Sequence, residues 1–158
     1  MEQVSIENRV AKLLLEKGLT LSISESCTGG LLGHRLTDVA GSSGFFAGGV
    51  TAYSYDAKEK VLKIKRRALE TYASVSKEIA LEMAWAAQTL FASDCALAIT
   101  GIAGPGGNKP GKPVGLTYIA LTTPTNAYWQ KHIWQGDRAS NKQQSVEAAL
   151  VFLEAMIK

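Results

Sequence analysis

The sequence predicts an α/β domain with three layers, in which helices cover both faces of a mixed sheet of about five strands. Two observations lead to this prediction. Segments with helical periodicity alternate along the chain with short apolar runs, as they do in domains built around a central sheet. No internal repeat or linker divides the 158 residues, so we expect residues 1–158 to form a single domain with one substantial core.

The first half of the chain alternates between helical and strand-like patterns. Apolar side chains recur at helical spacing before Gly18, and glycine is suited to end a helix there. The predicted elements of this half are a helix at 3–17, a strand at 19–24, a helix ending near Val39, a strand at 45–54 and a helical segment at 56–64.

The second half begins with a long amphipathic segment that Ser74 or Ser76 is expected to cap. A continuous apolar run then predicts a buried central strand, followed by the segment richest in glycine and proline. The predicted elements are a helix ending near Phe91, a strand at 95–100, a loop at 101–113, strands at 114–122 and 128–134, and a helix at 139–157.

The composition is that of an ordinary globular protein, with 46% hydrophobic and 20% charged residues. A net charge of +3 suits an anionic small molecule and is too weak to imply nucleic acid, so the basic residues Lys63, Lys65, Arg66 and Arg67 are interpreted as a solvated face. The two cysteines form no CxxC pair, which removes the usual metal and redox motifs. With no signal-peptide pattern and no apolar run long enough for a membrane span, we expect a cytoplasmic protein without a membrane partner.

The most informative stretch is Ser22–Gly30, where a predicted strand turns into a helix. Such a turn directs backbone N–H groups and the positive end of a helix dipole into the space above it. Ser26 in that position can act as a nucleophile or hold an anion, and Cys27 beside it is a competing nucleophile. The turn alone does not decide between these roles.

A nucleophilic serine needs a base, and neither histidine is well placed to be one. His34 lies eight residues beyond Ser26, which is roughly 12 Å along a helix, whereas a base must approach to about 3 Å. His132 lies within a predicted strand, where a packing role is favoured. Lys58 is the remaining candidate, because burial would lower its pKa and leave a neutral amine to deprotonate Ser26. Tyr53 would relay or orient that proton, and N–H groups near Thr28–Gly30 would stabilise an oxyanion.

Four loops are rich in glycine and hydroxyl residues, at 24–30, 41–49, 100–111 and 136–140. We expect them to converge on one pocket, because open α/β sheets bind ligands at the carboxyl ends of their strands. The third loop is neither a P-loop nor a GxGxxG fingerprint. Arg138, at the start of the last helix, is interpreted either as a bidentate phosphate ligand or as a surface arginine near a helix cap.

Five blocks of sequence, in order along the chain, resemble the CinA C-terminal domain family, which includes the nicotinamide-nucleotide amidohydrolases (NMN deamidases). The resemblance extends from about residue 5 to residue 155 and rests on Glu25–Gly30, Ala40–Ser43, Gly48–Ser54 with Lys58, Thr100–Gly107 and Gly136–Arg138.

The resemblance implies hydrolysis of the carboxamide of nicotinamide mononucleotide to nicotinate mononucleotide and ammonia, without a metal or cofactor. It implies that Ser26 is the nucleophile, Lys58 the base and Tyr53 an assisting residue. It also implies a three-layer fold, a small nucleotide as the substrate, and assembly of the chain into a homo-oligomer. The positions expected to bind that substrate are Thr28, Gly29, Gly30, Thr100, Gly101, Gly104 and Arg138.

Two positions depart from the family pattern. Tyr55 stands where an asparagine is common, and Lys142 stands where a second arginine often lies, which affects the expected substrate affinity and phosphate contact. Some family members carry a large N-terminal domain of the molybdopterin-binding type, and we expect none of its activity here. A different hypothesis for the same turns is a nucleotide- or phosphosugar-binding module without catalysis. The biological setting, cofactor salvage or DNA metabolism, stays open at this point.

Overall fold

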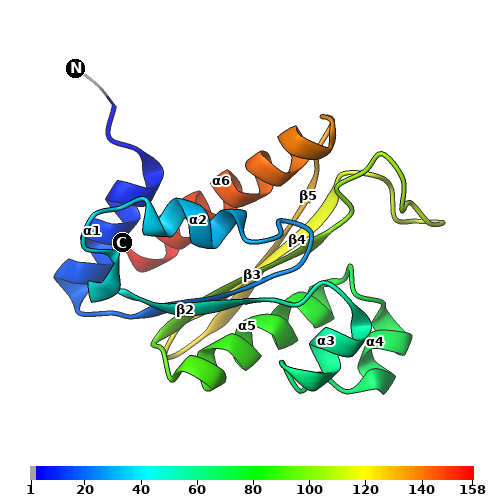
Figure 1. Ribbon diagram of the computed structural model, residues 1–158, viewed down its shortest axis with the longest axis horizontal. Helices are drawn as coiled ribbons and strands as arrows, with labels where there is room; N and C mark the ends of the chain where they lie inside the picture. Colours follow the sequence, from blue (N-terminus) through cyan, green and yellow to red (C-terminus); the bar gives the residue numbers. More distant parts are fainter. Residues whose placement is uncertain (1–2) are drawn as a thin grey trace.

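The computed structural model describes residues 3–158 of the chain (Figure 1). A single turn of 3₁₀ helix lies at Ser42–Gly44. The helices and strands are α1 (Ile6–Lys17), β1 (Leu21–Glu25), α2 (Leu31–Thr37), β2 (Phe46–Thr51), α3 (Tyr55–Lys60), α4 (Arg66–Tyr72), α5 (Lys77–Phe91), β3 (Cys95–Gly101), β4 (Leu116–Thr122), β5 (Ala127–Ile133) and α6 (Arg138–Ile157).

The five strands form one mixed sheet in the order β2-β1-β3-β4-β5. Strands β2, β1 and β3 are parallel, whereas β4 pairs antiparallel with both β3 and β5. Glu25, the last residue of β1, lies opposite Thr51 of β2 and Ile99 of β3. The carboxyl ends of three neighbouring strands therefore meet at one edge of the sheet, as the sequence predicted.

Helices cover both faces of this sheet (Figure 1). Helices α1, α2 and α6 lie on one face, and α3, α4 and α5 lie on the other. The buried apolar residues accordingly form two clusters. The first joins the sheet to α1, α2 and α6, and the second joins it to α4 and α5. The predicted three-layer α/β/α architecture is confirmed.

Most helices begin with a short polar side chain that accepts a backbone N–H, which satisfies one of the free donors of the first turn. Ser5, Ser54, Ser76 and Asp137 do this for α1, α3, α5 and α6 respectively. Helix α2 is different, because its N-cap is Gly30, which has no side chain and a φ of 102°. The start of α2 must therefore be fixed by another residue.

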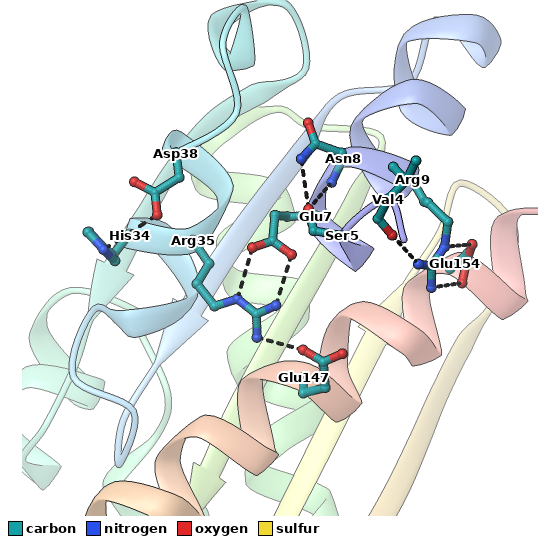
Figure 2. Close-up of polar contacts among 10 residues, drawn as sticks. All are labelled: Val4, Ser5, Glu7, Asn8, Arg9, His34, Arg35, Asp38, Glu147 and Glu154. Atoms are coloured by element: carbon teal, nitrogen blue, oxygen red, sulfur yellow. Dashed lines mark hydrogen bonds and ion pairs between the residues drawn. The ribbon is translucent and has the colours of Figure 1, made fainter. Parts of the chain in front are cut away.

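Ion pairs join the three helices of the first face (Figure 2). The Arg35 guanidinium on α2 lies between two carboxylates, with Nη2 2.9 Å from Glu7 Oε2 of α1 and Nη1 2.8 Å from Glu147 Oε2 of α6. Arg9 Nε of α1 is 2.8 Å from Glu154 Oε1 of α6. The Arg35 contacts hold α2 against its two neighbours, and the Arg9 contact joins those neighbours to each other.

The structure corrects the sequence-based expectation at two places. The basic side chains at 63–67 are exposed or half-buried, as a solvated face would be, but helix α4 was not predicted there from the sequence. That helix begins at Arg66, buries Leu69 and places the Arg66 guanidinium against Asp56 and Glu59. The loop expected at 41–49 is a 3₁₀ turn followed by the first residues of β2, and Phe46 pairs with Leu21 at the opposite end of β1 from Ser26. It therefore lies at the far edge of the sheet and does not join the other three loops.

Candidate active site

The structure brings Ser26 and Lys58 into direct contact. Lys58 Nζ lies 2.9 Å from Ser26 Oγ and donates a second hydrogen bond to the carbonyl oxygen of Ala52 at 2.8 Å. Ser26 comes from the turn after β1, and Lys58 comes from α3, which follows the neighbouring strand β2. The pairing thus follows from the parallel arrangement of two strands.

Lys58 is deeply buried, with 1% of its surface exposed. The Ser54 hydroxyl, which accepts the Ala57 N–H at 3.0 Å, fixes the start of α3 so that this lysine points inward. No carboxylate lies within ion-pair distance of its amine among residues 3–158. Burial lowers the pKa of Lys58 from an ordinary 10.5 to about 8. At pH 7 about a tenth of the amine is therefore neutral, far more than for a lysine with the ordinary pKa.

Backbone hydrogen bonds fix the turn that holds Ser26. The Ser26 N–H donates to the carbonyl of Ile99 on β3 at 3.0 Å, and the Gly29 N–H donates to the Ser26 carbonyl at 3.1 Å. The N–H groups of Thr28 and Gly30 have no acceptor among residues 3–158. These two groups remain able to bind an oxyanion, whereas that of Gly29 is already occupied.

Arg138, the first residue of α6, connects two other parts of this edge. Its Nη1 donates to the carbonyl of Gly104 at 2.7 Å, and its Nη2 donates to the Tyr53 hydroxyl at 2.9 Å. Tyr53 is 58% exposed, so its ring lies at the mouth of the site. A cavity of about 590 Å³ borders Arg138 and is lined by Ala103, Pro105, Val114, Gly136, Asp137 and Ala139. Of the four loops expected to converge, those at 100–111 and 136–140 meet here, and they are joined by Tyr53 from the segment after β2.

The hydroxyls of two expected substrate-binding residues point into the protein. Thr28 is fully buried and donates to Glu25 Oε1 at 2.7 Å, and Thr100 donates to the carbonyl of Ser74 at 2.8 Å. Gly101 lies so close to the Leu116 carbonyl, 2.8 Å from where a Cβ would stand, that no larger residue fits. These positions shape the walls of the site through the fold.

Two further residues of α6 lie at the site: Asn141, for which no role was predicted from the sequence, and Lys142, which the sequence linked to the phosphate contact. The buried side chain of Asn141 donates to the Ala103 carbonyl at 3.0 Å and accepts the Gly136 N–H at 3.0 Å, which ties two loops together. Lys142 Nζ lies 3.8 Å from the point where a Cβ of Gly29 would stand, so its ammonium approaches the Ser26 turn. A polar residue on the inward face of an amphipathic helix was the one available signal for Asn141.

The alternative nucleophile and bases lie in unfavourable surroundings. Cys27 is buried, and burial raises the pKa of its thiol to about 12, which leaves almost no thiolate at neutral pH. His34 is exposed beside Asp38 (Figure 2), and His132 stacks on Trp134 with ring centroids 4.6 Å apart. Ser26 and Lys58 therefore remain the candidate nucleophile and base.

Two features are absent from residues 3–158. Over that range no three His, Cys, Asp or Glu side chains gather as they would around a metal ion. In the same part of the chain, each helix is either too short or too polar to cross a membrane.

Comparison with known families agrees with this architecture. The profile of the CinA C-terminal domain matches residues 3–157, nearly the whole chain. The chain belongs to the CinA C-terminal domain family. A CinA-like protein of Geotalea uraniireducens is 46% identical over 134 residues, which is 85% of this chain and 32% of that protein. The chain spans about a third of the length of the curated relatives it matches.

Solved structures of the CinA superfamily have the same fold. One from Klebsiella pneumoniae superposes with a TM-score of 0.94 at 33% identity, covering 96% of this chain and 95% of that one. The competence/damage inducible protein CihA of Agrobacterium tumefaciens gives a TM-score of 0.92 at 34% identity and covers all of both chains.

Tyr55, which departs from the CinA family pattern, has a structural role here. Its hydroxyl accepts the Ser74 N–H at 3.3 Å, and the Arg66 guanidinium lies 5.8 Å from the centre of its ring. Tyr55 therefore contacts the α4–α5 connection, the same connection whose Ser74 carbonyl accepts the Thr100 hydroxyl. The substitution leaves the Ser26–Lys58 contact intact.

Proposed function

We propose that this CinA domain is a serine amidohydrolase that converts nicotinamide mononucleotide to nicotinate mononucleotide and ammonia in pyridine nucleotide salvage. The observation that chiefly supports the proposal is the buried pair of Ser26 Oγ and Lys58 Nζ, 2.9 Å apart. Burial lowers the pKa of Lys58 to about 8, which suits a general base working near neutral pH. A site that only bound a phosphate would gain more from a lysine that stays charged.

In the first half of the reaction, neutral Lys58 removes the Ser26 proton as Ser26 Oγ attacks the carboxamide carbon. The N–H groups of Thr28 and Gly30 are the available donors for the oxyanion that forms. Lys58, now an ammonium, returns the proton to the departing nitrogen. Ammonia leaves when the C–N bond breaks, and the nicotinoyl group remains on Ser26 as an ester.

In the second half, Lys58 removes a proton from water, and the hydroxide attacks the ester carbonyl. The same two N–H groups stabilise the second oxyanion. The C–O bond to Ser26 breaks, Lys58 returns the proton to Ser26 Oγ, and nicotinate mononucleotide leaves. The bond from Lys58 Nζ to the Ala52 carbonyl, 2.8 Å, keeps the amine in place in both protonation states.

In this proposal, positively charged side chains at the mouth of the site bind the phosphate of the nucleotide. Arg138 forms hydrogen bonds to a backbone carbonyl and to the Tyr53 hydroxyl but has no carboxylate partner among residues 3–158, so its charge remains available to a phosphate. Lys142, which approaches the Ser26 turn, adds a second positive charge one helical turn away. The cavity of about 590 Å³ beside Arg138 is of the size that small-molecule ligands occupy.

Ammonia release from nicotinamide mononucleotide tests the proposal, with free nicotinamide and nicotinamide riboside as comparison substrates. Ser26→Ala is expected to abolish turnover, whereas Cys27→Ala retains most of it because the buried thiol is protonated. Turnover that survives in Ser26→Ala would contradict the nucleophile assignment. Tight binding of pyridine nucleotides by the wild type without turnover would instead favour a non-catalytic binding module.

A further inference from the structure

Glu25, the last residue of β1, is a buried carboxylate directly before Ser26. Its surface is 2% exposed, and no lysine or arginine lies within ion-pair distance among residues 3–158. Burying a carboxylate is costly unless hydrogen bonds satisfy it. Such a residue is retained only where its hydrogen bonds do something that a neutral side chain cannot.

All three donors to this carboxylate come from the segment that starts just after Ser26. Oε1 accepts the Thr28 hydroxyl at 2.7 Å and the Leu32 N–H at 2.9 Å, and Oε2 accepts the Gly33 N–H at 3.2 Å. Glu25 therefore caps α2 from five residues before its N-cap Gly30, which has no side chain to do so. This long-range cap closes residues 26–30 into a tight loop between β1 and α2.

The backbone of Glu25 contributes to the other half of the Ser26–Lys58 pair. Its carbonyl accepts the Ala52 N–H at 2.9 Å, and the Ala52 carbonyl accepts a hydrogen bond from Lys58 Nζ at 2.8 Å. Through its side chain Glu25 fixes the Ser26 turn, and through its main chain it fixes the residue that holds Lys58. No other residue of the site is linked to both halves in this way within residues 3–158.

From these contacts we infer that Glu25 is a positioning residue, which sets Ser26 Oγ against Lys58 Nζ by capping α2 across the Ser26–Gly30 turn. The inference rests on the proposed function only in that Ser26 is the nucleophile. Glu25 does not act as an acid or base, because its carboxylate oxygens bind Thr28, Leu32 and Gly33. An acid at this position is required because three donors need an acceptor that offers no hydrogen of its own.

The Glu25→Gln variant tests this requirement. The amide keeps the shape but places an NH₂ group against at least one N–H donor, so the turn shifts. A displacement of the nucleophile by about 1 Å lowers turnover by up to about 100-fold. We expect kcat to fall by this order with KM little changed, and labelling of Ser26 by phenylmethanesulfonyl fluoride to slow in parallel. Glu154→Gln is the matched control, because it removes another largely buried, hydrogen-bonded carboxylate that lies on α6 beside Arg9.

Two measurements keep the inference independent of the substrate. Sulfonyl fluoride labelling reports on Ser26 even if the wild type releases no ammonia, an outcome that would defeat the proposed function alone. If the wild type takes up no label, an NMR titration of Lys58 replaces it, and in Glu25→Gln we expect the lysine pKa to rise from about 8 as the loosened turn admits water.

Thr28→Val provides a milder version of the same test if Glu25→Gln does not fold. It removes one of the three hydrogen bonds and is expected to slow labelling by about fivefold. A wild-type labelling rate and an unmoved Lys58 titration in the folded Glu25→Gln variant, or in Thr28→Val in its place, would overturn the inference. Equal slowing in Glu154→Gln would also overturn it, because that would indicate a general loss of stability.

Discussion

Two regions of this molecule place a cationic side chain in opposite electrostatic surroundings. On the outer helical face, Arg35 lies between Glu7 and Glu147, and hydrogen bonding to Arg35 lowers the pKa of Glu7 (Figure 2). At the sheet edge, Lys58 is more deeply buried yet has only a hydroxyl and a carbonyl as partners, and burial lowers its pKa. The first arrangement stabilises charges, and the second destabilises one.

The difference indicates what each region contributes. A paired, partly exposed cation adds modestly to stability and has no reason to lose its proton. An unpaired buried lysine costs stability, and folds retain such groups mainly where a neutral amine is useful. The comparison predicts that the two regions can be separated by mutation, one changing activity and the other changing stability.

Lys58→Met should have the largest effect, because it is expected to lower activity and to raise stability in the same variant. Loss of the base is expected to lower kcat about 100- to 10,000-fold. The same variant removes an amine whose pKa of about 8 in the fold lies below its ordinary 10.5, so at pH 7 the protein should gain about 1–3 kcal/mol of stability. Ammonia release and urea unfolding measure the two effects. A Lys58→Met variant that is less stable than wild type would contradict the view that burial of the Lys58 charge destabilises the fold.

The pH dependence sharpens the same point in the wild type. Below a pH of about 8 Lys58 is protonated and cannot accept the Ser26 proton, so kcat/KM should rise with pH through an apparent pKa of about 8. Stability should rise over pH 8 to 10.5, because in that range the unfolded chain holds a proton on this lysine that the fold does not. A kcat/KM that is flat from pH 6 to pH 9 would rule out a neutral lysine as the base.

Arg138→Lys should affect binding more than chemistry. A lysine keeps the positive charge but cannot hold the Gly104 carbonyl, the Tyr53 hydroxyl and a phosphate in one plane. We expect KM for nicotinamide mononucleotide to rise about tenfold with kcat within about a factor of three. Nicotinamide riboside, which has no phosphate, serves as the control substrate and should show a much smaller change. A loss confined to kcat would mean that Arg138 acts on the reacting atoms.

The contact between Ser26 and Lys58 could be anticipated from the sequence because it depends on element order. Once β1 and β2 are parallel neighbours, the residues that follow them must meet at one edge of the sheet. Arg138 was predictable for the same reason, since β5 ends at that edge. These relations need the order of strands and helices along the chain, which hydrophobic periodicity indicates, together with the placement of ligands at the carboxyl ends of strands.

The hydrogen-bond partners of buried polar groups could not be predicted from the order of strands and helices. The inward direction of the Thr28 and Thr100 hydroxyls, and the capping of α2 by Glu25, depend on side-chain packing between segments. A charged residue at the end of a strand predicted to be buried was a visible signal that Glu25 needs partners. Helix α4 was missed because its 7 residues begin with two arginines, and neighbouring acidic side chains stabilise that start only in the folded protein.

Arg35→Gln should have the smallest effect. It is the sharpest test of whether the ion pairs on the helices affect stability alone and leave activity unchanged. Arg35 joins α2 to α1 and α6, and α2 begins at the Ser26 turn, so a rigid α2 could in principle transmit the change to the site. Because Glu25 fixes the start of α2 independently, we expect kcat to stay at the wild-type value. Stability should fall by about 1 kcal/mol, or about 2–4 °C in Tm, and the loss should shrink at high salt. A matching fall in kcat would show that the ion pairs of the outer face help to position Ser26, and the two regions would then have to be treated as one unit.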